Sequence, residues 1–232
     1  ETLFKDSANT VIENAKNAYQ TAGMSANEYM ETVTSFSASL LQGLSGDTGK
    51  AAEVADMALT DMSDNANKMG SSMESIQNAY QGFAKQNYTM LDNLKLGYGG
   101  TKSEMERLLA DAKELTGIEY DIDSLADVYD AIHVIQEDLG ITGTTAKEAA
   151  TTIEGSMASA KAAFDNFLVN KISVEDFASA IGTAAGNIAR NLGEIIPRLA
   201  ETVPVAAKAI LKELNTVFQE NGAESQWGFH YD

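Results

Sequence analysis

The sequence predicts an all-α protein, a multi-helix bundle of about eight helices followed by a longer, proline-kinked helical segment. Helix-start signals recur along the chain, glycines follow the apolar segments, and no stretch alternates apolar and polar residues long enough to indicate a strand. The 232 residues, 44% of them apolar, are enough for a buried core. There is no cysteine, which excludes disulfides and thiolate metal sites.

The helix starts are predicted from a serine or threonine followed three residues later by an acidic residue. In such a capping box the hydroxyl accepts from one unpaired amide and the carboxylate accepts from another. The pairs are Ser25 with Glu28, Ser71 with Glu74, Thr101 with Glu104, Thr145 with Glu148 and, more weakly, Ser173 with Asp176. Ser124 is a further predicted N-cap, with Asp127 favouring the positive end of its helix. The predicted helix stops are Gly23, Gly43, Gly46, Gly70, Gly117 and Gly140.

Between these signals, apolar residues recur every three or four positions and predict the helix faces that are buried. The stripes are Tyr29, Val33, Phe36 and Leu40; Val54, Met57, Ala58, Met62 and Met69; Met73, Ile76, Tyr80 and Phe83; Met105, Leu108, Leu109, Ala112 and Leu115; Leu125, Val128, Tyr129, Ile132, Ile135 and Leu139; and Ile153, Met157, Ala160, Phe164 and Leu168. The methionines at helical spacing are predicted to fill the core.

Apolar residues from Phe177 to Val203 follow an eleven-residue rhythm, typical of a nearly straight helix. Pro197 is expected to kink or end this helix because proline removes a backbone donor. A self-association face is predicted from Ala178, Gly182, Gly186 and Ile188. We therefore predict three regions: a helical domain at 1–170, an elongated helical segment at 171–222 kinked near Pro197, and an irregular aromatic tail at 223–232.

A glycine-rich stretch at 97–103 precedes one predicted helix and has the look of a phosphate loop. A phosphate loop needs glycine directly before its lysine and again five residues earlier in the motif, and Lys102 has Thr101 and Leu96 at those positions. The dinucleotide motif fails as well, because its third glycine would fall at Lys102. The stretch is interpreted as a helix entry that carries a capping box.

No cofactor, metal or catalytic set is predicted. The acidic segment 120–132 fails as a calcium loop, since its fifth and twelfth positions are Leu125 and Ile132. His133 and His230 are far apart and lack a metal-binding or triad motif. We therefore expect the chain not to be an enzyme.

The chain carries a net charge of −18, and most of the acid comes early. Through residue 140, nine basic residues stand against 23 acidic ones. Such a surface repels phosphates and anionic lipids, so sequence-specific nucleic-acid binding is not expected. No run of apolar residues is long enough to predict a membrane span. The chain begins at Glu1 with no leader pattern, which we interpret as a piece of a longer protein.

Three long strings carry a resemblance: 21–70, beginning TAGMSANEYM; 72–117, beginning SMESIQNAYQ; and 127–168, beginning DVYDAIHVIQ. Together they resemble the tape measure protein of long-tailed bacteriophages. The resemblance covers roughly residues 20–168 and is specific as a long string. One departure is Phe164, where related sequences tend to have tryptophan, so only local packing is affected.

The resemblance implies a structural protein of the phage tail. Tape measure proteins lie as a few parallel copies in the lumen of the tail tube, help set tail length, and leave ahead of the DNA. The implied partners are copies of the chain itself, tail tube and tail-tip proteins, and tail assembly chaperones, with membrane contact only during infection. The implied location is the virion, and the host cytoplasm during assembly. The resemblance supplies no catalytic residue.

Two other classes of protein remain open. One is a helical interaction protein or secreted effector of the host. The other is a membrane-active helical domain involved in genome delivery, favoured by the small residues of 177–211 and opposed by the charges within that segment. The flanking sequence discriminates best, since a very long chain with heptads favours the tape measure protein.

Overall fold

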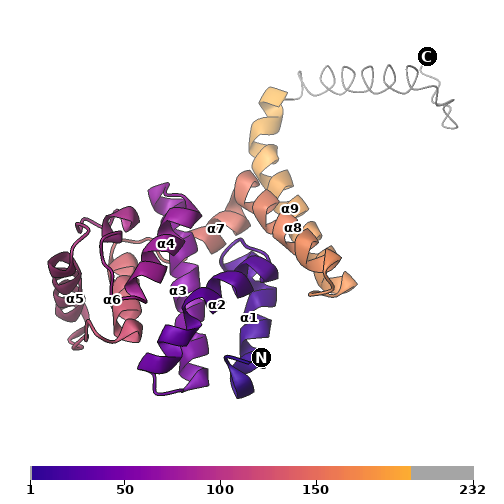
Figure 1. Ribbon diagram of the computed structural model, residues 1–232. Coiled ribbons are helices and arrows are strands. Elements are labelled where there is room, and N and C mark those ends of the chain that lie inside the picture. Colours follow the sequence, from indigo (N-terminus) through magenta and orange to yellow (C-terminus); the bar gives the residue numbers. More distant parts are fainter. Residues whose placement is uncertain (1, 200–232) are drawn as a thin grey trace, which may run out of the picture. The chain divides into compact units, whose positions relative to one another are not determined.

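The computed structural model describes the backbone of residues 2–199 and the side chains of residues 2–191. Within this range it contains nine α-helices, two short 3₁₀ helices and no strand, which confirms the predicted all-α class (Figure 1). The elements are η1 (Lys5–Ser7), α1 (Ala8–Thr21), α2 (Ala26–Gly43), α3 (Thr48–Met69), α4 (Met73–Phe83), η2 (Leu91–Leu94), α5 (Lys102–Thr116), α6 (Leu125–Asp138), α7 (Thr144–Thr151), α8 (Ile153–Leu168) and α9 (Val174–Leu199).

The chain divides into two compact units, Glu1–Ile188 and Ala189–Asp232. The first half of α9 therefore belongs with the helices before it, whereas the sequence led us to expect a boundary near residue 170. Helix α9 is the longest of the described helices and runs through Pro197, so the proline does not end it. The part of the predicted elongated segment beyond residue 199 and the predicted aromatic tail lie outside the described residues.

Four helices, α2, α3, α4 and α6, surround the centre of the first unit (Figure 1). Aromatic rings from three of them meet there: Phe36 lies 5.6 Å from Tyr129 in an edge-on arrangement, and Tyr80 lies 5.0 Å from Tyr129. The Tyr129 hydroxyl donates to the backbone oxygen of Tyr80, so its polar end is paired inside the core. The stripes predicted for α2, α4 and α6 supply most of this core, while Leu139 at the end of α6 is exposed.

The methionines predicted as core filler are found there. Met62 is fully buried on α3, and Met57, Met69 and Met73 pack against the same core from partly buried positions. Along α3 the buried residues include Ala51, Ala52, Ala55 and Ala58, whose small side chains let neighbouring helices approach. On α5 the predicted stripe is buried except for Leu115, which is exposed near the end of the helix.

Four of the six predicted helix starts are confirmed, at Ser25, Thr101, Ser124 and Ser173, and those at Ser71 and Thr145 are corrected. Ser25 with Glu28 forms a complete capping box, and Ser124 and Ser173 accept from the amides of Asp127 and Asp176. At α4 the cap is Ser72, one residue later than predicted. The neighbouring Ser71 hydroxyl instead donates to the backbone oxygen of Asn93, so tertiary contact decides between the two serines.

At α5 the predicted box forms only in part. The Thr101 hydroxyl accepts from the Glu104 amide as expected, but the Glu104 carboxylate accepts from the Gly99 amide (3.0 Å). Arg107 donates both to that carboxylate (2.6 Å) and to the Gly97 oxygen (2.9 Å). The glycine-rich entry is thus closed by the protein's own side chains, which agrees with its interpretation as a helix entry.

Helices α7 and α8 meet at a single residue, Thr152, which ends one and caps the other. Close approach at this corner requires glycine. A Cβ atom added to Gly155 would lie 2.4 Å from the carbonyl carbon of Glu148. Several predicted glycine stops have positive φ, as at Gly70 and Gly117, which both cap helices in the left-handed conformation.

The prediction for α8 is wrong in orientation. Its apolar stripe was expected to be buried, but Met157, Phe164 and Leu168 are 60%, 46% and 63% exposed. The buried residues of α8 are Ser156, Ala162, Ala163 and Asn166. The helix therefore docks through its small and polar side and presents its large apolar side to solvent.

Candidate functional site

Helix α3 carries a row of buried polar residues through the interior of the first unit. The row consists of Asp61, Ser63, Asp64 and Asn65. Buried carboxylates are costly unless they are paired or hydrogen-bonded. These side chains are therefore expected to have hydrogen-bond partners on neighbouring elements.

Asp61 pairs with His133 of α6. The carboxylate is 1% exposed, and its two oxygens lie 2.9 and 3.0 Å from Nδ1 of the imidazole. Burial raises the pKa of the Asp61 carboxyl to about 6, although the hydrogen bond and charge of His133 oppose this shift. The hydrogen bond with Asp61 raises the pKa of His133 against the opposing effect of burial. The two groups titrate as a coupled pair that retains protons in the folded state.

Asp64 caps a helix that belongs to a different part of the chain. Its Oδ2 accepts from the Gly143 amide (2.6 Å) and its Oδ1 accepts from the Thr145 amide (2.8 Å), at the start of α7. The predicted capping box of Thr145 with Glu148 is therefore wrong: the N-cap of α7 is Gly143, two residues before Thr145, and a carboxylate from α3 accepts from the first amides. The negative charge of Asp64 is also favourable at this position, because the N-terminus of a helix carries a partial positive charge.

Several buried polar atoms have no hydrogen-bond partner in the part of the chain that the structure describes. They are Asn65 Oδ1, Gln136 Oε1, Thr142 Oγ1 and Asn166 Nδ2. Their residues are otherwise well held: the Asn65 amide group donates to the Leu94 oxygen (3.0 Å), and Asn166 Oδ1 accepts from the Ala26 amide (2.7 Å). Asn65 and Asn166 thus link helices α3 and α8 to other elements of the chain.

Among the residues whose side chains the structure describes, the Asp61–His133 pair comes nearest to part of a catalytic triad. A histidine oriented by a buried carboxylate forms part of a hydrolytic triad, which also needs a nucleophile at the other ring nitrogen. Among the described residues no hydroxyl hydrogen bonds to that nitrogen, and no group of three or more histidine, cysteine, aspartate or glutamate residues is arranged to hold a metal ion. The pair supports a structural and titrating role.

The pairing of Asp61 with His133 was not predicted from the sequence. His133 was predicted only to lack a metal-binding or triad motif, and no partner was predicted for it. One signal was present: Asp61 lies three residues after Ala58 and one before Met62, within the core-facing stripe of α3. An acidic residue in such a position requires a partner on a neighbouring helix.

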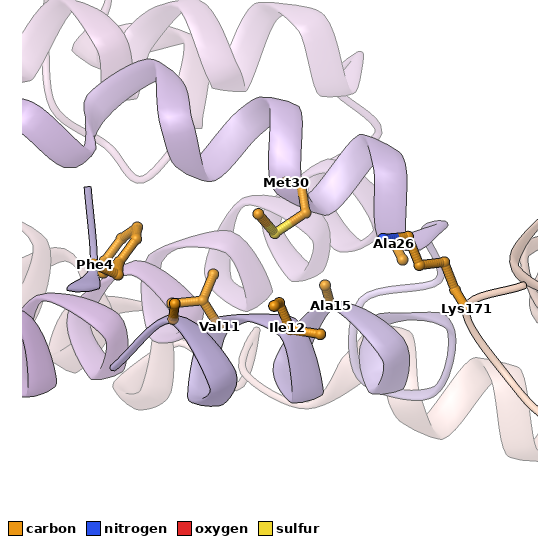
Figure 2. A pocket seen from close by; sticks show the side chains of 8 residues that line it. Phe4, Val11, Ile12, Ala15, Ala26, Met30 and Lys171 are labelled. Atoms are coloured by element: carbon orange, nitrogen blue, oxygen red, sulfur yellow. The ribbon is translucent and has the colours of Figure 1, made fainter. Parts of the chain in front are cut away.

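A small apolar cavity of about 220 Å³ lies between α1 and α2 (Figure 2). Val11, Ile12 and Met30 line its middle, with Phe4 at one end and Lys171 at the other. A single ammonium group among apolar side chains offers neither an acid–base pair nor a set of metal ligands. The cavity does not supply catalytic groups.

The predicted self-association face lies on α9. Ala178 and Gly182 are exposed, Gly186 and Ile188 are half-buried, and a Cβ atom added to either glycine would meet nothing within 4 Å. Phe177, Ala180 and Ala184 point the other way, toward α1, α7 and α8. At 100° per residue, the row of Ala178, Gly182 and Gly186 is on the opposite side of the helix from this packed side.

The turn between α8 and α9 extends the exposed apolar surface. Val169 and Val174 are exposed in and beside the turn, and Ile181 is exposed on α9. Phe177 joins the two helices, with its ring 4.6 Å from that of Phe167 and 6.0 Å from that of Phe164. Apolar surface outside the core is thus concentrated on α8 and the start of α9.

Comparison with known proteins adds no relative: no family model, no curated protein and no solved structure matches this chain. None of the helices in residues 2–199 is both long and apolar enough to cross a membrane.

Proposed function

We propose that this chain is a segment of a phage tail tape measure protein, serving as a docking or terminal domain rather than as the measuring stalk. A ruler needs an unbroken helix, because length then scales at about 1.5 Å per residue. Helices α1 to α8 instead fold back on one another, and α9, with 26 residues, extends only about 39 Å. The stalk would lie elsewhere in the same protein.

The observation that carries this proposal is the pair of unoccupied surfaces on α8 and α9. One is a stripe of large apolar side chains, the other a row of small residues, and both belong to an otherwise acidic all-α unit. Exposed apolar surface of this kind marks protein–protein contact. The resemblance of residues 20–168 to tape measure proteins supplies the class of assembly.

In this role the chain acts by binding rather than by catalysis. Its partners would be copies of itself, tail tube and tail-tip proteins, and tail assembly chaperones. It would occupy the tail lumen in the virion and leave ahead of the DNA, and it would meet a membrane only during infection. The strongly acidic surface suits a protein that shares a channel with DNA without gripping it.

A helical interaction protein or secreted effector is the second candidate, because the same two surfaces would serve any helical partner. A membrane-active domain has less support. Arg190, Glu194 and Arg198 recur within the segment that would have to insert, and each charge is costly at the bilayer centre.

Purified particles test the proposal. An antibody against the first unit should detect the chain in intact virions and no longer in particles that have ejected their DNA. Deleting residues 123–140 from the phage gene should block tail assembly, because the other helices lose the surface on which they pack. Absence of the chain from virions would refute the proposal, and tails shortened in proportion to the deletion would show that the segment measures length.

A further inference from the structure

We propose that the exposed stripe of α8 binds the same stripe of a second copy of this chain, with the two helices antiparallel. We call this surface the α8 stripe and define it as Met157, Phe164 and Leu168. This inference goes beyond the proposed function, because a free-standing helical protein would carry the same interface.

The α8 stripe is turned away from the side of α8 that docks on the rest of the chain, and only Phe164 touches another ring, that of Phe177. Helix α8 docks on α1 through Ala162 and Ala163, which contact Tyr19, while the stripe lies on the far side of the helix. An amphipathic helix normally turns its large apolar side chains inward. Helix α8 instead turns its large apolar side chains outward, which leaves a surface that another molecule can cover.

Electrostatic repulsion limits where a second copy can approach. Through residue 140, nine basic residues stand against 23 acidic ones, so two such surfaces repel each other. Between residues 152 and 191, three basic residues stand against four acidic ones. The α8 region is therefore where like-charged copies meet with the least repulsion.

The charges beside the α8 stripe favour the antiparallel orientation. Lys161 and Asp165 form an ion pair (3.0 Å) along one flank of the α8 stripe. In an antiparallel pair of helices, the same flank of both copies meets, so Lys161 of each copy lies opposite Asp165 of the other. This register also sets Met157 beside Leu168 of the second copy. A parallel pair would place this charged flank against Ala160 and Phe167, which offer no charge.

The α8 stripe is thus complementary to itself under a two-fold axis, in both its apolar residues and its flanking charges. A contact of this kind is isologous and closes at two copies. The small-residue row on α9 is a different surface, so the two surfaces can be tested separately.

Sedimentation equilibrium of the full chain over a concentration series provides the first measurement. The unaltered chain should form a dimer, and Met157→Glu or Leu168→Glu should weaken dimerisation at least about tenfold, because each places a charge in the apolar contact. The matched control is Leu115→Glu on α5, where the native side chain is 51% exposed, and it should leave dimerisation unchanged. Circular dichroism checks that every variant stays folded.

Cross-linking tests the orientation of the two helices. Because the native chain has no cysteine, every disulfide must come from the introduced residues. Met157→Cys mixed with Leu168→Cys should give the mixed disulfide in excess over self-linked product from either variant alone, since only close Cα atoms can be bridged. Lys161→Asp should weaken the dimer, and adding Asp165→Lys should restore it.

Three outcomes would overturn the proposal. The first is a chain that stays monomeric throughout the concentration series. The second is a dimer that tolerates both glutamate variants but is lost in Gly182→Leu, which would assign the contact to α9. The third is preferential self-linking of Met157→Cys, which would make the helices parallel.

Discussion

The α2–α6 bundle and the α7–α9 region are held by different kinds of side chain. The bundle buries large aromatic and aliphatic residues such as Phe36, Tyr80 and Tyr129. The α7–α9 region docks through alanines and through polar bonds from Asp64 and Asn166, with its large apolar residues outside. Each large apolar side chain that is buried contributes about 1.5–3 kcal/mol, so the bundle holds most of the stability. The second region is attached through specific polar bonds but buries few large apolar side chains, so its attachment is expected to be the weaker one.

The largest expected effect comes from a matched pair of phenylalanines, one in each region. Phe36→Ala, at a position 1% exposed, should lower the free energy of unfolding by about 3–5 kcal/mol. Phe164→Ala should cost about 1 kcal/mol or less, since that ring is partly exposed and contacts Phe177 only at its side. Urea unfolding of both variants measures the difference. Equal losses would mean that the α8 stripe is part of the folding core.

A smaller effect is expected at the cap that joins the regions. Asp64→Ala leaves the amides of Gly143 and Thr145 without their acceptor and should cost about 2 kcal/mol. Hydrogen exchange should show lost protection in α7 and α8 and little change in α2 and α6. Asp64→Asn keeps one acceptor oxygen, so its loss of stability should lie between that of Asp64→Ala and that of the native chain. Uniform loss of protection would contradict a separate attachment of α7–α9.

Two glycines should respond in opposite directions to the same change. Gly155→Ala forces a Cβ atom against the Glu148 backbone where α7 meets α8, and should cost about 1–2 kcal/mol. Gly182→Ala adds a methyl group in open space on α9 and should raise stability by about 0.5–1 kcal/mol. Thermal unfolding of both variants makes the comparison. A loss at Gly182 would show that another chain already covers the row in solution.

The smallest effect is a pH dependence that belongs to the bundle alone. Asp61 and His133 each have a folded-state pKa above the unfolded value, so each stabilises the fold fully below its unfolded pKa. The contribution of Asp61 is lost as the pH rises through about 6, and that of His133 is lost above about 6.5, through its raised pKa. Stability from this pair therefore falls as the pH rises from about 4, first through the Asp61 pKa of about 6 and then through the raised pKa of His133.

Urea unfolding at pH 5 and pH 8 measures this fall. The double variant Asp61→Asn with His133→Gln should show a smaller drop than the native chain, by on the order of 1 kcal/mol. Asp123→Asn, at an exposed carboxylate, is the control. An unchanged drop in the double variant would assign the pH dependence to other groups.

The same contrast explains what periodicity predicts and what it misses. Helix existence followed from capping residues and apolar spacing, because these signals lie within one helix. The stripe of α8 was just as regular as that of α2, but the side that faces inward is decided by what other helices offer. Tyr19 and the Ala26 amide, far away in sequence, accept the small side of α8. Asp64 as the cap of α7 was hidden for the same reason, since its partners come about 80 residues later.

The bond between the Ala26 amide and Asn166, 140 residues apart in the chain, also orders events during synthesis. All of α1 to α6 leaves the ribosome before Asn166 does, by roughly one to six seconds at ordinary elongation rates. In that interval the bundle can fold while its docking site for α8 is vacant.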